Sequence, residues 1–251
     1  MSLKSDIENA LSKYLAESRE GLIAEQPSRL NRGEGTQAPY FMLKIDLANS
    51  TRQLQMRSPA IYLKLSHAYL STLDEITHRF GADSDQTEYA GDSVLAYFPR
   101  TIDIEQSVIA CAGACRFAVD QIRKMDVSLR QIELRTRIVC HYGMLIVANI
   151  GPWGARQRKV MGLPLHSVAR AEESITAGSG LVTLEAAAQI TPKYVSKYLY
   201  ANYRSDPAST ALNQLTGGFG LGGFGLNPGG TKTIEYYLMR WGVIYRDLDL
   251  Q

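Results

Sequence analysis

The spacing of apolar and polar positions changes along the chain and predicts where helices and strands lie. Apolar residues recur at near-helical intervals over residues 3 to about 20 and predict an amphipathic helix: Leu3, Ile7, Leu11 and Leu15. The following polar segment, rich in Pro and Gly, predicts a linker up to Tyr40. The apolar run YFMLKID predicts a strand that ends at Asp46. Pro59 suits the first turn of a helix that ends near Phe80.

Two predicted hairpins follow, each with a helix after it. The strand-like runs SDQTEYA and SVLAYFP flank the turn-forming pair Gly91-Asp92. A long helix is predicted for IDIEQSVIACAGACRFAVDQIRKM, and a second hairpin with a glycine turn for IELRTRIVCHYG and MLIVANIG. Further along, the pattern predicts a helix in GLPLHSVARAEESIT, a short strand and helix in SGLVTLEAAAQI, and a last strand with an extension in TIEYYLMRWGVIYRDL.

Hairpins that alternate with single helices predict an α+β fold. The expected sheet is mixed and mostly antiparallel, as in ferredoxin-like arrangements, with helices packed on it. Residues 1–39 form the predicted N-terminal helix and linker, and residues 40–251 the predicted domain. Within residues 215–230 the near-repeat GGFGLGGFGL lacks the GK[ST] ending of a phosphate-binding loop. A flexible loop or a projecting arm is therefore the favoured interpretation.

Composition limits the function classes only loosely. A chain of 251 residues with 45% hydrophobic and 21% charged residues has ordinary globular usage, and its net charge of +2 does not indicate a polyanion-binding protein. No run of about 18 apolar residues predicts a transmembrane helix, and the N-terminus lacks a signal-peptide core. Three cysteines without scaffold spacing favour the reducing cytoplasm, and Cys111 and Cys115 share one helix face, which predicts core packing.

Asp46 and Asp92 are the first candidates for chemistry. Asp46 ends an apolar strand and Asp92 lies at a hairpin tip, so neighbouring strands would bring their carboxylates together. Two close carboxylates raise one pKa, and a pair of divalent cations removes that repulsion and attracts phosphate oxygens. Spacing alone leaves the ordinary alternative, a capping or turn aspartate at each position, equally open.

A basic segment between a predicted strand and the next helix adds a second candidate site. It carries Arg156, Arg158 and Lys159. A solvated charge run is the ordinary interpretation, but a position before a helix start also suits anionic groups.

Four motifs occur in order between about Tyr40 and Thr183: FMLKIDLANSTRQL, EYAGDSVLAYF, RTRIVCHYGMLIVANIG and KVMGLPLHSVARAEE. They resemble, in the same order, the two metal motifs, the hairpin motif and the block G-x-x-V-N-x-A-A-R-L-E of the class III nucleotidyl cyclases. The resemblance implies that two Mg²⁺ or Mn²⁺ ions bind to the carboxylates of Asp46 and Asp92 and to the backbone carbonyl of Leu47.

The resemblance also implies roles for residues around the substrate. Ser50 and Thr51 would lie near the triphosphate. The triphosphate-binding lysine of the family has no clear match, and Lys232 is the nearest candidate.

The resemblance further implies roles for residues that contact the transition state, the ribose and the base. Arg170 falls on the arginine that stabilises the transition state, and His166 stands where the family usually has a ribose-orienting asparagine. Glu88 stands where adenylate cyclases have a base-reading lysine and guanylate cyclases a glutamate. Lys159 stands at the second base-reading position, which is usually Asp, Thr or Cys.

A compact stand-alone cyclase with YAGDSVLAYFP looks most like the pyrimidine cyclases of bacterial Pycsar antiphage defence. The resemblance implies a cytoplasmic homodimer that makes cyclic UMP or cyclic CMP for a separate effector. One protomer would supply the metal aspartates, and the other Arg170, His166 and the base readers. The N-terminal helix and the Gly/Phe segment would add dimer contacts, with packing on its own domain as the alternative for the helix. Neither nucleic acid nor membrane insertion is expected.

The residues themselves do not choose the base. If Glu88 accepts a hydrogen bond and Lys159 donates one, each of the four bases offers a matching donor and acceptor. Pocket depth would decide, because a purine needs a deeper slot. UTP is therefore predicted from the resemblance alone, with CTP, GTP and ATP as the enzymatic alternatives. An inactive nucleotide-binding or dimerisation module is the non-enzymatic alternative.

Overall fold

The computed structural model describes most of the chain. The described parts are residues 3–17, 30–48, 50, 58–152, 157–205 and 232–250. The strands are β1 (Gly35–Leu47), β2 (Glu88–Ala90), β3 (Ser93–Pro99), β4 (Thr136–Ile150), β5 (Gln157–Met161), β6 (Gly180–Val182), β7 (Leu199–Ser205) and β8 (Lys232–Met239). The helices are α1 (Leu3–Glu17), α3 (Pro59–Arg79), α4 (Ile104–Met125), the 3₁₀ turn η2 (Val127–Leu129), α5 (Leu163–Glu173), α6 (Leu184–Ala187), α7 (Pro192–Tyr198) and α9 (Trp241–Asp247).

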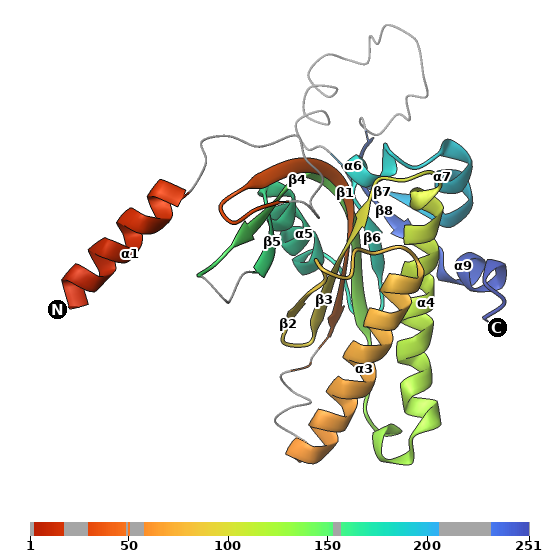
Figure 1. The fold of residues 1–251 in the computed structure, drawn as a ribbon. Coiled ribbons are helices and arrows are strands. Elements are labelled where there is room, and N and C mark those ends of the chain that lie inside the picture. The colour runs from red at the N-terminus through yellow and green to blue at the C-terminus, as the bar shows by residue number, and fades with distance from the viewer. Residues whose placement is uncertain are drawn as a thin grey trace, which may run out of the picture.

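The described strands form one eight-stranded sheet. Its order is β2-β3-β1-β4-β6-β8-β7, with β5 paired to β4 outside this path. The pairing of β4 with β6 is parallel, and the other pairings are antiparallel. The predicted α+β class with a mixed, mostly antiparallel sheet is therefore confirmed, and Figure 1 shows the helices flanking the sheet.

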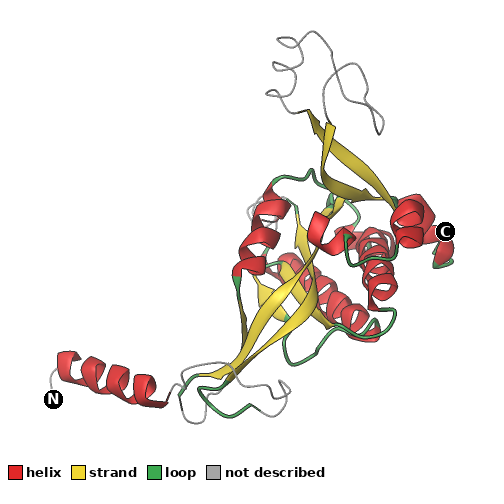
Figure 2. Ribbon diagram, turned by 90° about the horizontal axis from the view of Figure 1, so that it is seen from above, coloured by secondary structure: helices red, strands yellow, loops and turns green. Residues whose placement is uncertain are grey.

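Alternation along β1 explains why both faces of the sheet are covered. Phe41, Leu43 and Ile45 point to one face and join the buried side chains of α3 and α4. Tyr40 and Met42 point to the other face, where Val168 of α5 is buried in the same cluster. Figure 2 shows helices on both sides of the sheet.

Two local predictions hold in the helices that cover the first face. Ser58 caps α3, its Oγ accepting a hydrogen bond from the backbone N–H of Ile61 at 3.4 Å, and Pro59 is the first residue of that helix. Cys111 and Cys115 are both buried in α4 with their Sγ atoms 3.9 Å apart. Their predicted role in core packing is confirmed.

The second predicted hairpin is wrong. Residues 136–150 form the single strand β4, and Gly143 lies within it, paired with Tyr40 rather than at a turn. A Cβ at Gly143 would lie 2.5 Å from Cγ of Pro164, so this glycine lets α5 approach the strand. The hairpin partner of β4 is β5, so Arg158 and Lys159 belong to a strand instead of a basic loop. Arg156 lies outside the described residues.

The structured region begins earlier and contains more elements than predicted. β1 starts at Gly35, within the segment interpreted as a linker, and Leu30 and Glu34 before it are already buried. Helix α7 and strand β7 were not predicted, because a seven-residue helix running directly into an edge strand leaves little periodicity to detect. The Gly-rich segment 215–230 lies outside the described residues.

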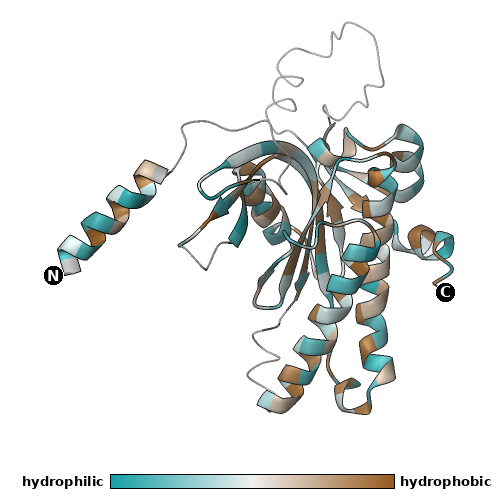
Figure 3. Ribbon diagram, viewed as in Figure 1, coloured by the Kyte–Doolittle hydropathy of each residue, from teal (hydrophilic) through white to brown (hydrophobic). Residues whose placement is uncertain are grey.

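Helix α1 presents its apolar positions to solvent. The exposed fractions of Ile7, Leu11 and Leu15 are 51%, 57% and 73%. Figure 3 shows brown and teal bands alternating along this helix, and Figure 1 shows it standing away from the sheet. The described contacts therefore do not support packing of α1 on its own domain, and its role in a dimer stays a prediction.

Gly180 provides a test of the packing between β6 and α9. A Cβ at this position would lie 2.3 Å from Cζ2 of Trp241, whereas one at Gly242 would meet no heavy atom within 4 Å. We expect Gly180→Ala to lower the free energy of unfolding by about 1–3 kcal/mol through overpacking. The control Gly242→Ala, in helix α9, should be neutral or stabilising by up to about 1 kcal/mol. Urea unfolding measures both, and equal effects would contradict the packing described.

Candidate active site

Asp46 and Asp92 come together at one end of the sheet. β1 pairs with β3 through Ile45 and Val94, so Asp46 lies beside the turn between β2 and β3 that carries Asp92. The charge of Asp92 contributes to the raised pKa of Asp46. The structure thus brings together the two carboxylates proposed as metal ligands.

The pKa of Asp46 is raised to about 7. Burial is the largest cause, followed by the neighbouring charges of Glu172 and Asp92, while Lys44 opposes the shift. The carboxyl is therefore held where negative charge is already in excess. A divalent cation would relieve this excess.

The polar atoms at this end of the sheet suit a hard cation. Oδ2 of Asp92 is buried, and within the described part of the chain no hydrogen-bond donor reaches it. Carboxylate and carbonyl oxygens are the ligands that Mg²⁺ and Mn²⁺ prefer. The described residues contain no group of three or more His, Cys, Asp or Glu side chains that could hold a metal ion. The two aspartates and the carbonyl of Leu47 stay the predicted ligands.

Three charged residues beside Asp46 were not predicted as part of the site. Nζ of Lys44 lies 2.5 Å from Oε2 of Glu172, and Nη1 of Arg137 lies 3.7 Å from both Oε1 of Glu172 and Oδ2 of Asp46. Lys44 shares a strand face with Asp46, two residues away, and Arg137 is the β4 partner of Asp46. Strand alternation places Lys44 beside Asp46, but the approach of Glu172 depends on the docking of α5.

Helix α5 packs one face on the sheet and exposes the other. Val168 is buried and the Glu172 side chain is only 13% exposed, so these residues, four apart, face the sheet. His166 and Arg170, also four apart, are exposed on the opposite face. Arg170 therefore points away from Asp46 of its own chain and has no hydrogen bond or ion pair within the described residues.

The two predicted base readers line one cleft of about 380 Å³. Glu88 comes from β2 and Lys159 from β5. The hydroxyl of the buried Tyr97 donates a hydrogen bond to Oε2 of Glu88 at 3.3 Å, and Arg158 pairs with Asp85 at 3.1 Å on the cleft wall. Burial, and then the charge of Glu88, raise the pKa of Tyr97, so its hydroxyl stays protonated as a donor.

The remaining predicted substrate contacts are described only in part. Ser50 is half-buried shortly after β1, and Thr51 lies outside the described residues. Lys232 begins β8, paired with Ser205, and its side chain is outside the described part.

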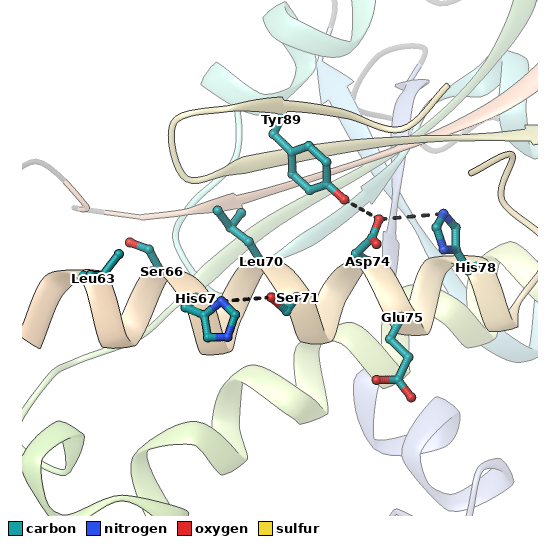
Figure 4. A pocket seen from close by; sticks show the side chains of 9 residues that line it. All are labelled: Leu63, Ser66, His67, Leu70, Ser71, Asp74, Glu75, His78 and Tyr89. Carbon is teal, nitrogen blue, oxygen red and sulfur yellow. Dashed lines mark hydrogen bonds and ion pairs between the residues drawn. The ribbon is translucent and has the colours of Figure 1, made fainter. Parts of the chain in front are cut away.

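A larger hollow, of about 630 Å³, lies along α3 on the other face of the sheet. Figure 4 shows Tyr89 pointing from the hairpin toward Asp74, to which its hydroxyl donates a hydrogen bond. His78 approaches the same carboxylate, with Nε2 3.7 Å from Oδ1. None of the predicted site residues lines this hollow. Its contacts tie β2 to α3 and so support the hairpin that carries Asp92.

Comparison with solved structures identifies the class of fold. The chain is similar to the guanylyl cyclase Cya2, with 19% identity and a TM-score of 0.62 over 82% of this chain and 92% of that chain. It is also similar to the adenylyl cyclase CyaB from P. aeruginosa, with 14% identity and a TM-score of 0.61 over 82% of this chain and 95% of that chain.

A third similar structure is a class III adenylyl cyclase-like ATP-binding protein from Pseudomonas aeruginosa, with 14% identity and a TM-score of 0.61 over 77% of this chain and 45% of that chain. No protein-family model and no curated protein sequence matches. The chain therefore has the fold of the class III nucleotidyl cyclases. Among its described helices, none has the length and apolar character needed to cross a membrane.

The raised pKa of Asp46 predicts a pH-dependent stability. In the metal-free protein the folded state holds this proton up to about pH 7, whereas the unfolded chain releases it near 3.8. The folded state thus binds more protons across this window, and the free energy of unfolding should lose this contribution as pH rises from about 4 to 7. Asp46→Asn should flatten that part of the pH profile, and the exposed Asp249→Asn should not. Equal pH profiles for wild type and Asp46→Asn in urea unfolding would contradict the shift.

Proposed function

We propose that this protein is a class III nucleotidyl cyclase that converts UTP to cyclic UMP and pyrophosphate as a C2 homodimer. One observation carries the proposal. Within a class III cyclase fold, Asp46 and Asp92 meet at one end of the sheet, while Arg170 and His166 project from the outward face of α5. Each chain thus presents two complementary halves of a phosphoryl-transfer site.

The proposed reaction is an intramolecular displacement at phosphorus. The ribose 3′-oxygen attacks the α-phosphorus, the bond to the bridging oxygen breaks, and pyrophosphate leaves. Two Mg²⁺ or Mn²⁺ ions held by Asp46, Asp92 and the Leu47 carbonyl would lower the pKa of the 3′-hydroxyl and neutralise the triphosphate. Arg170 of the partner protomer donates hydrogen bonds to the charge that grows on the α-phosphate, and His166 orients the ribose.

The directions of these side chains support a dimer. Arg170 faces away from the Asp46 of its own chain, so in this arrangement only a second copy can bring the two together. Ser50, Thr51 and Lys232 are the proposed triphosphate contacts. The apolar stripe of α1 is proposed as a further contact between the two copies.

The choice of UTP rests on the sequence resemblance, and the cleft supports the roles of Glu88 and Lys159 as base readers. Glu88 and Lys159 line it together, so one acceptor and one donor can meet the edge of a base. Tyr97 donates a hydrogen bond to Glu88 and packs edge-to-face on Tyr40, with ring centroids 6.5 Å apart, and so holds the acceptor in place. The product is proposed to act as a cytoplasmic second messenger in antiphage defence.

A panel of the four nucleoside triphosphates tests the proposal. With Mn²⁺ we expect UTP to be converted to cyclic UMP and pyrophosphate faster than CTP, GTP or ATP, with the products identified by mass spectrometry. Asp46→Asn and Arg170→Ala should each lower kcat by about 10²-fold or more, because a metal ligand or a transition-state donor is lost. The exposed Asp249→Asn and Arg79→Ala are matched controls that should leave kcat unchanged.

The outcomes separate the competing functions. Exclusive conversion of ATP or GTP would overturn the choice of UTP but not cyclase activity. Nucleotide binding without any cyclic product would favour an inactive nucleotide-binding module. Full activity of Asp46→Asn would contradict the two-metal mechanism.

A further inference from the structure

Helix α5 is attached to the sheet by apolar side chains and by one largely buried polar contact. Oε2 of Glu172 lies 2.5 Å from Nζ of Lys44, and the two side chains are only 13% and 21% exposed. A short, charge-assisted contact with little solvent around it fixes direction more strongly than an exposed ion pair does. The apolar attachment of α5 comes from Val168, which is buried one turn earlier, with Leu165 and Ala171 packed against the same cluster. The ion pair adds a directional contact to this apolar packing.

The same carboxylate also reaches the metal end of the sheet. Nη1 of Arg137 lies 3.7 Å from Oε1 of Glu172 and 3.7 Å from Oδ2 of Asp46. Lys44 and Asp46 point to one face of β1, and Arg137 is the direct β4 neighbour of Asp46. Glu172 therefore forms ion pairs with Lys44 and Arg137, the two positively charged side chains beside Asp46, which is the proposed metal ligand.

Helix geometry connects this contact to Arg170. The two residues are two positions apart, which separates their directions by about 200° around an α-helix. When Glu172 is held against the sheet, Arg170 must project outward. Rotation of α5 that frees Glu172 would turn Arg170 by the same angle, and an error of about 1 Å in a catalytic group can cost about 10²-fold in rate.

We propose that Glu172, held by Lys44, is a positioning residue that orients Arg170 toward the active site of the partner protomer. The proposal rests on the cyclase function and on its two-protomer site. Glu172 also adjoins Asp46 of its own chain. In the proposed dimer this Asp46 belongs to one active site and Arg170 of the same chain belongs to the other, so Glu172 would connect the two sites. The alternatives are that Glu172 serves only the Asp46 of its own chain, or that it only stabilises the fold.

A dimer with one working site distinguishes these alternatives. Two differently tagged chains, one with Asp46→Asn and one with Arg170→Ala, are co-expressed and the mixed dimer is purified. Its single working site takes Asp46 from the Arg170→Ala chain and Arg170 from the Asp46→Asn chain. Glu172→Gln is then added to either chain, and kcat and KM for UTP with Mn²⁺ are measured.

We expect Glu172→Gln in the Asp46→Asn chain, which supplies Arg170, to lower kcat by roughly ten- to a hundredfold with KM little changed. Binding of an unreactive UTP analogue, measured by calorimetry, should also be unchanged, because positioning of a transition-state group does not affect ground-state binding. Glu173→Gln on the same helix is exposed and is the matched control, with no effect expected. Unchanged kcat with Glu172→Gln in that chain would overturn the proposal, whether or not the other placement has an effect.

A second variant guards against a general loss of structure. Lys44→Gln removes the other partner and should reproduce the kcat loss, and the Lys44→Gln/Glu172→Gln double variant should cost no more than either single variant. Additive losses would show that the two residues do not act through one contact and would contradict the proposal. Dimer content and urea unfolding are recorded for each variant. Activity of the unmodified mixed dimer establishes the cyclase function separately, so failure of this inference and failure of the function are distinguishable.

Discussion

The carboxylates of Asp46, Asp92 and Glu172 lie close together at one half-buried end of the sheet, and the neighbouring side chains offset only part of their charge. Lys44 and Arg137 supply two positive charges, and burial still leaves the pKa of Asp46 at about 7. Oδ2 of Asp92 has no donor within the described residues. In the proposed enzyme, this uncompensated negative charge would favour the binding of divalent cations and, through them, of a triphosphate.

The contacts at this end of the sheet also determine which residues of α5 face inward and which face outward. Its inward face carries Val168 and Glu172 and closes over the sheet, so His166 and Arg170 are presented outward. A helix cannot turn both faces to one site, because residues two apart point in nearly opposite directions. In the proposed enzyme, the separation of metal ligands from the transition-state arginine is thus a consequence of how α5 docks, and dimerisation completes the site.

Much of the fold could be predicted from periodicity, and the failures have physical causes. The apolar run YFMLKID and the strand-like composition of SVLAYFP predict β1 and β3, and the positions of Asp46 at a strand end and of Asp92 at a turn predict that their carboxylates meet. Gly143 was misinterpreted as a turn because a glycine that admits a helix and one that reverses the chain look alike in sequence. Glu172 stands at the last position of the block in KVMGLPLHSVARAEE, but its contact with Lys44 joins segments 128 positions apart, so the motif does not report which residue it contacts.

In the proposed enzyme, each active site needs two chains. The specific activity with UTP and Mn²⁺ over a dilution series tests this requirement, with dimer content measured in parallel by analytical ultracentrifugation. We expect specific activity to fall in proportion to the dimer fraction, because a monomer would hold only half-sites. Constant specific activity in samples that are monomeric would contradict it.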